Sequence, residues 1–160
     1  MLKIKYFTIL IMACCISLGA ATAETKTFKE KTAALRTPDT LNWKLLGIIK
    51  FVKKPHKDYG EVNYPMVNTK LKSLHKKKVV MTGFIVPIDN TNYALSKNVF
   101  ASCFFCGKAG PETIIGLKFR KPKRYKTDQY VTLEGTFRVN EANVDDWIYN
   151  IDDAVIVKGD

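Results

Sequence analysis

The segment Tyr130-Val-Thr-Leu-Glu-Gly-Thr-Phe-Arg-Val139 alternates apolar and polar residues along its whole length. A period of two is typical of a β-strand that turns one face to a core and the other to solvent. The core face would carry Val131, Leu133, Gly135, Phe137 and Val139. This segment therefore predicts a half-buried strand in a mainly β protein.

Four more segments share this strand-like character. Val79–Ile88 (VVMTGFIVPI) is β-branched and aromatic with Gly83 at its centre, and Thr113–Phe119 (TIIGLKF) is similar, with Gly116. A glycine inside a strand marks a bulge or sharp bend, as at the corner of a small barrel. Tyr93–Ala101 and Trp147–Val157 complete a set of five predicted strands.

Five strands without a long amphipathic helix predict a small five-stranded barrel like the OB-fold, which is a five-stranded Greek-key barrel. An SH3-like barrel or a small sandwich is the alternative. Upstream, Leu41–Val52 could start as a short helix and favours a strand towards its end. Lys53–Pro65, which contains two prolines and a glycine, predicts a loop, and Met66–Leu74 predicts a short helix.

The N-terminus has the three parts of a secretory signal. Lys3 and Lys5 precede the apolar segment Tyr6–Gly19, and Ala21-Thr-Ala23 forms a small-x-small cleavage pattern. We expect a signal peptide at 1–23, a flexible leader at 24–38 and a single OB-like β domain at 39–160. The mature protein would be periplasmic and without a transmembrane span. A lipid anchor at Cys14 and a short uncleaved anchor are the alternatives.

The predicted mature chain is strongly basic. Without the two lysines of the signal, 24 of the 26 Lys and Arg residues remain against 15 acidic residues, a net charge of +9. Residues 128–160 reverse the balance, with 2 basic and 8 acidic side chains. Such a field is typical of exported proteins that meet anionic lipid, lipopolysaccharide or an acidic partner. Solubility alone is the simpler interpretation.

The densest basic run is Lys118–Lys126 (KFRKPKRYK), with six positive charges and two aromatic residues. On an OB-fold this combination would suggest single-stranded nucleic acid, but the export signal argues against nucleic acid. The run is either a solvated turn between strands or a contact with an envelope protein complex or an anionic membrane surface. That contact would use Lys118, Arg120, Lys121, Lys123, Arg124 and Lys126.

Chemistry is indicated at one place, Ser102-Cys-Phe-Phe-Cys-Gly107. Cys103 and Cys106 are the cysteines that lie outside the predicted signal, and this spacing lets two thiolates reach one ion. Cu(I) accepts two thiolates, whereas zinc needs further ligands. Glu112 could supply an oxygen, and His56 or His75 a nitrogen, although isolated histidines are more often surface residues.

Two other interpretations of the cysteine pair stay open. It could form a structural disulfide that pins a loop, or it could exchange thiols. The second is disfavoured because the segment Gly107–Pro111 does not start the helix that activates a thioredoxin-like thiol, although a helical turn could begin at Pro111. The sequence contains no phosphate loop, serine nucleophile elbow or His-Glu-x-x-His motif, so we expect a protein that is not an enzyme.

Four blocks, in this order, resemble a family of uncharacterised exported proteins from Bacteroidetes-type bacteria. They are Leu41-Asn-Trp-Lys-Leu-Leu-Gly47, Val80-Met-Thr-Gly-Phe-Ile-Val-Pro-Ile88, Ala101-Ser-Cys-Phe-Phe-Cys-Gly-Lys-Ala-Gly-Pro-Glu-Thr113 and Arg124-Tyr-Lys-Thr-Asp128. More distantly, the chain is similar to a broader exported bacterial domain of unknown function, often encoded near transporter and metal-uptake genes. Leu74-His-Lys-Lys77 departs from the Leu-Asp-Gly-Lys turn common in such proteins.

The resemblance implies a candidate site at Cys103, Cys106 and Glu112 and transfers no activity. Our first hypothesis is an envelope protein that binds a soft metal ion, Zn or Cu(I), through the two cysteines. The second is a non-catalytic binding or adaptor module for a transporter-associated envelope complex, with a structural Cys103–Cys106 disulfide. The third is an exported thiol oxidoreductase.

Overall fold

The computed structural model describes residues 37–100, 109–121 and 123–159. Contacts divide the chain into the units Met1–Thr37 and Pro38–Asp160, and the second unit is the one described below. Its elements are β1 (Asp39–Thr40), α2 (Trp43–Leu46), β2 (Ile49–His56), β3 (Gly60–Val67), α3 (Thr69–Leu74), β4 (Lys78–Pro87), β5 (Tyr93–Ser96), the 3₁₀ turn η1 (Pro111–Thr113), β6 (Ile114–Phe119), β7 (Tyr130–Val139) and β8 (Tyr149–Gly159).

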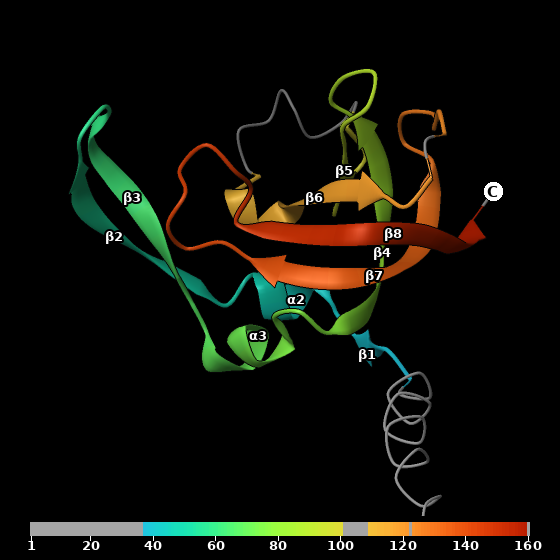
Figure 1. Ribbon diagram of the computed structural model, residues 1–160, viewed down its shortest axis with the longest axis horizontal. Helices are drawn as coiled ribbons and strands as arrows, with labels where there is room; N and C mark the ends of the chain where they lie inside the picture. The colour runs from blue at the N-terminus through green and yellow to red at the C-terminus, as the bar shows by residue number, and fades with distance from the viewer. Residues whose placement is uncertain (1–36, 101–108, 122, 160) are drawn as a thin grey trace, which may run out of the picture. The chain divides into compact units, whose positions relative to one another are not determined.

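Five of the strands close into a barrel (Figure 1). The order is β4-β5-β6-β8-β7, and β7 pairs back onto β4. The β6–β8 pair is parallel and the other four pairs are antiparallel. The short strand β1 adds to β4 in parallel. The predicted mainly β, OB-fold-like five-stranded barrel is confirmed.

The barrel interior follows the alternation that β7 shows in the sequence. Val131, Leu133 and Phe137 are buried, and Tyr149 and Ile151 of β8 join them in one core. Burying a large apolar side chain contributes about 1.5–3 kcal/mol, so these strands hold the barrel together. For β7 the predicted bounds are the observed ones.

The two short helices pack onto this core. Each begins with an asparagine cap: Asn42 accepts the N–H of Leu45, and Asn68 accepts the N–H of Leu71. Such caps stabilise a helix start by about 1 kcal/mol, which matters for helices this short. The 3₁₀ turn η1 begins at Pro111, where the sequence allowed a helical turn.

The prediction of a loop over Lys53–Pro65 is wrong, because this segment forms most of the antiparallel β2–β3 hairpin. An antiparallel ladder alternates pairs that exchange hydrogen bonds with pairs whose backbone groups point outward. Pro65 pairs with Phe51 and Pro55 pairs with Glu61, and both pairs belong to the same alternating set. Both prolines therefore occupy positions where the missing N–H costs no ladder hydrogen bond.

Smaller differences concern element ends. Helix α3 begins at Thr69 because the preceding Met66 and Val67 continue β3. Strand β5 ends at Ser96, and β8 begins at Tyr149 instead of Trp147. No helix in the described part of the chain combines the length and apolarity needed to cross a membrane.

Candidate binding groove

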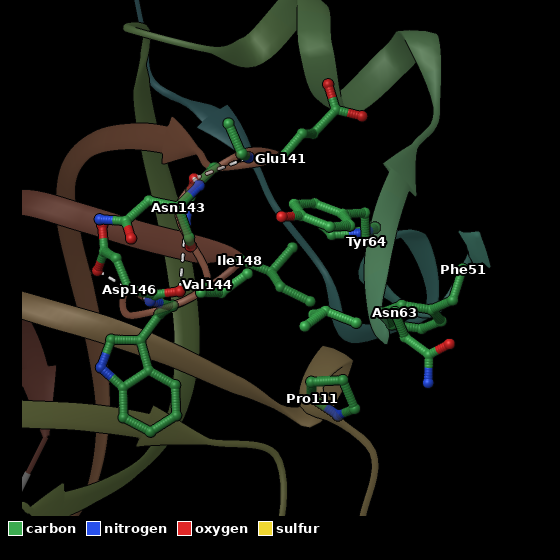
Figure 2. A pocket seen from close by; sticks show the side chains of 14 residues that line it. Phe51, Asn63, Tyr64, Pro111, Glu141, Asn143, Val144, Asp146 and Ile148 are labelled. Atoms are coloured by element: carbon green, nitrogen blue, oxygen red, sulfur yellow. Dashed lines mark hydrogen bonds between the residues drawn. The ribbon is translucent and has the colours of Figure 1, made fainter. Parts of the chain in front are cut away.

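A groove of about 480 Å³ lies between the β2–β3 hairpin and the β7–β8 loop, residues 140–148. Figure 2 shows Tyr64 and Ile148 facing each other across it. Pro111 of η1 lines it as well, which brings three separate stretches of chain together. Its apolar lining residues are Phe51, Val62, Tyr64, Pro65, Pro111, Ala142, Val144, Trp147 and Ile148.

The β7–β8 loop is organised by the side chain of Asn140. Its amide nitrogen donates to the carbonyl oxygens of Asn143 (2.6 Å) and Asp146 (3.1 Å). Its amide oxygen accepts the N–H groups of Ala142 and Asn143. Asparagine makes such local turns because its side chain can replace backbone partners. The loop therefore presents Val144 and Ile148 on a pre-formed wall.

Arg138 neutralises one carboxylate of the groove. Its Nη1 donates to Asp146 Oδ2 at 2.8 Å and its Nε donates to Asp152 Oδ2 at 3.0 Å. The hydrogen bond that Arg138 donates to Asp146 is the main reason why the pKa of Arg138 is raised. The fork of one guanidinium thus ties the β7–β8 loop to strand β8.

Glu141 ties the base of the hairpin to the same loop. Its Oε1 accepts the N–H of Val67 at 2.9 Å, and its Oε2 pairs with Lys72 Nζ at 2.8 Å. Burial opposes ionisation of Glu141, but the bonds from Lys72 and Val67 outweigh it, so the pKa of this carboxyl is lowered. The second groove carboxylate is therefore also paired.

The tip of the hairpin has its own contact with the loop. Tyr59 Oη donates to Asp145 Oδ1 at 3.0 Å, and this hydrogen bond is the main reason why the pKa of Tyr59 is raised. His56 stacks on the Tyr59 ring with centroids 4.9 Å apart. The groove is thus bridged at both ends, by Val67–Glu141 and by Tyr59–Asp145.

The two cysteines of the predicted metal site lie outside the described residues. Glu112 lies in η1, half-buried and next to Pro111, at the edge of the groove. Within residues 37–100, 109–121 and 123–159, no three His, Cys, Asp or Glu side chains come together as a metal site would require. The site at Cys103, Cys106 and Glu112 stays a prediction.

Both histidines have local structural roles. His75 Nδ1 accepts the N–H of Val139 at 3.1 Å, which joins the end of α3 to β7. His56 Nδ1 accepts the N–H of Asp58 in the hairpin turn.

The basic run ends β6 and continues into the connection to β7. Tyr93, Phe119 and Tyr125 pack edge-to-face or tilted against one another, with centroids 4.3–5.5 Å apart. Tyr93 Oη donates to Lys123 O at 3.2 Å and holds the loop against the barrel. The aromatic residues of the run therefore anchor it by packing, and two of its cations, Lys123 and Arg124, line a hollow beside Asn90 and Thr91.

Sequence reasoning missed the hairpin, and with it one wall of the groove. A usable signal was present: Lys57-Asp-Tyr-Gly60 is a turn sequence between two runs that contain Val and Tyr. Glu141 carried no such signal, because its partners are 69 and 74 positions away in the chain.

Comparisons with protein-family models, curated proteins and solved structures found no match.

Proposed function

We propose that this protein is an exported, non-catalytic binding module of the bacterial envelope, which holds a partner protein in the groove between the β2–β3 hairpin and the β7–β8 loop. The main support for the proposal is that both carboxylates lining the groove are paired with cations. Asp146 is neutralised by Arg138 and Glu141 by Lys72, so the remaining lining is apolar or amide.

Such a surface suits binding better than catalysis. An apolar cleft with a few placed polar groups is typical of ligand sites, and volumes of 300–1,000 Å³ are common for them. General acid–base or nucleophilic chemistry needs an activated side chain facing the substrate. Here the groove carboxylates are engaged in fixing the loop and the hairpin.

Photo-crosslinking from the groove in the cells that produce the protein tests this. A benzoylphenylalanine at Asn63 should form one dominant adduct, and one at Lys158, on the exposed end of β8, should not. The adduct partner, identified by mass spectrometry and purified, should bind the wild type at least tenfold more tightly than Val144→Arg, which places a charge in the groove. The proposal is wrong if the wild type and Val144→Arg bind the partner equally well. It is also wrong if positions 63 and 158 give equal amounts of adduct.

A second candidate function is favoured by Glu112. Glu112 is half-buried and lies six residues after Cys106. We propose that Glu112 joins Cys103 and Cys106 in binding a soft ion, Cu(I) or Zn, because a partly buried carboxylate needs a compensating charge.

Intact mass and elemental analysis of the protein purified from the periplasm decide between the two states of the cysteines. One retained ion, two alkylatable thiols and loss of the ion in Cys103→Ser would support the metal site. A mass two units low, with no alkylation and no ion, means a disulfide and leaves the binding module alone. Rapid exchange of that disulfide with glutathione would favour the oxidoreductase.

A further inference from the structure

A hollow of about 410 Å³ lies where the chain leaves β6. Two stretches of chain form it: the turn that leads from β4 into β5, and the end of β6 with the connection to β7. Its lining residues are Asn90, Thr91, Tyr93, Phe119, Lys123 and Arg124. None of these residues lines the groove between the hairpin and the β7–β8 loop. The hollow is therefore a separate candidate site.

One wall of the hollow is a turn that Asp89 holds in place. Its Oδ1 accepts the N–H groups of Thr91 and Asn92, both at 2.7 Å, and its Oδ2 accepts the side-chain amide of Asn92. A carboxylate that replaces backbone partners in this way fixes the conformation of a turn. Asn90 and Thr91 therefore border the hollow in fixed positions, and the exposed amide of Asn90 can donate a hydrogen bond to a ligand.

Two aromatic rings and two cations complete the lining. The rings of Tyr93 and Phe119 pack edge to face with centroids 5.5 Å apart, and Tyr93 Oη donates to Lys123 O at 3.2 Å. This packing fixes the backbone that carries Lys123 and Arg124, both of which are exposed. Apolar surface thus lies beside two positive charges, which suits an organic anion. The volume is within the range of about 300–1,000 Å³ that is common for small organic ligands.

The charge around the hollow stays positive when the carboxylates of the adjoining segments are counted. The basic run, Lys118–Lys126, has six cations and no carboxylate. The turn before β5, the connection to β7 and the part of β8 that pairs with the end of β6 contribute three carboxylates, Asp89, Asp128 and Asp153. Arg138 with its two carboxylate partners adds one further negative charge. Six positive charges against four negative ones leave an excess of two, and the lining itself contains no carboxylate.

We propose that this hollow binds the phosphate ester of a small polyol or sugar, with Lys123 and Arg124 on the phosphate and the rings of Tyr93 and Phe119 against the carbon skeleton. The guanidinium fork matches two phosphate oxygens, and the ammonium serves as a point charge for a third. A carboxylate offers two oxygens in one plane and would use fewer of these donors. The same ester group occurs in soluble sugar phosphates and in the headgroups of anionic lipids, so both are sources of the ligand.

Titration of the purified protein with glycerol 3-phosphate, followed by amide NMR, tests the site. Saturable shifts should be concentrated at Asn90, Thr91, Lys123 and Arg124, and glycerol, which has the same carbon skeleton without the phosphate, should not cause them.

A matched pair of double variants shows whether the place of the charges matters. Lys123→Gln with Arg124→Gln should weaken binding of glycerol 3-phosphate about tenfold or more, since each lost charge-assisted hydrogen bond is worth about that factor. Lys53→Gln with Lys57→Gln removes two charges from exposed hairpin positions and should bind like the wild type. Circular dichroism and thermal unfolding verify that both variants fold.

Vesicles distinguish the two sources of the ligand. If the ligand is a lipid headgroup, phosphatidylglycerol vesicles should sediment the wild type at about 0.1 M salt, where exposed charges are screened beyond about 10 Å. Phosphatidylcholine vesicles, and the variant without Lys123 and Arg124, should show no such sedimentation. If the ligand is a soluble ester, glycerol 3-phosphate should bind whereas phosphatidylglycerol vesicles should not sediment the protein.

The inference is wrong if neither glycerol 3-phosphate nor the phosphatidylglycerol vesicles bind, or if the two double variants weaken binding equally. It does not rest on the proposed function of the groove. Val144→Arg, which places a charge in the groove, should leave the binding of glycerol 3-phosphate unchanged, so the two proposals can fail separately.

Discussion

The indole of Trp147 lies directly over Gly116, so close that a Cβ built on Gly116 would overlap the ring. The same arrangement occurs on β4, where a Cβ on Gly83 would stand 3.0 Å from Trp43 Cζ2 and 2.7 Å from Ser96 O. Trp43 is held there by its Nε1–H, which donates to Thr82 O at 2.9 Å. Gly83 and Gly116 therefore each accommodate a tryptophan from a neighbouring segment.

Gly116→Ala should destabilise the protein by about 1–3 kcal/mol, because overpacking forces the ring or the strand to move. Trp147→Ala in the same chain should recover part of this loss. Urea unfolding of the wild type, both single variants and the double variant measures the coupling. Additive effects would show that the contact between the two residues is not the cause.

Arg138→Met should cost about 1.5–3 kcal/mol, because it leaves two carboxylates without their charge-assisted hydrogen bonds. The loss should exceed that of Arg124→Met, which removes an exposed arginine from the β6–β7 connection. Chemical unfolding provides the comparison. If Arg138→Met is no worse than Arg124→Met, the guanidinium does not hold the β7–β8 loop to β8.

Glu141 should make the free energy of unfolding depend on pH in the acidic range. Its pKa is lowered in the folded protein, so its contribution is present above the ordinary carboxyl pKa near 4.5 and is lost as pH falls through the folded value. Wild type and Glu141→Gln should therefore differ in unfolding free energy at pH 7, and this difference should shrink as the pH falls below 4.5. Glu61→Gln, at an exposed hairpin position, is the control. A difference that persists unchanged at pH 3 would contradict the assignment.

Tyr59→Phe should release the tip of the hairpin without unfolding the barrel. The Tyr59–Asp145 hydrogen bond is exposed, so the melting temperature should stay nearly unchanged. Amide exchange at 57–63 should become faster, whereas exchange in β7 should not. Tyr130→Phe, another exposed tyrosine, should leave the hairpin as it is. Unaltered exchange at the tip in Tyr59→Phe would mean that the contact does not restrain it.

The barrel was predictable because its signals are local. The alternation of Tyr130–Val139 and the glycine-centred strands reflect one-sided burial, which each segment displays by itself. The hairpin is not predicted from local sequence because its prolines and its glycine also indicate a loop. Pro55 and Pro65 are tolerated because they occupy positions whose backbone N–H would point away from the partner strand. Which positions these are depends on how the two strands pair.

The mainly β class, the five barrel strands and the position of the basic run can be predicted from the hydrophobic period and the charges along the chain. The groove and the pairing of its carboxylates exist only in the folded chain. Glu141 meets Val67 and Lys72 across more than sixty positions of sequence. The entropic cost of closing a loop of that length is offset by the packing of the whole barrel. No local sequence pattern therefore predicts these contacts of Glu141.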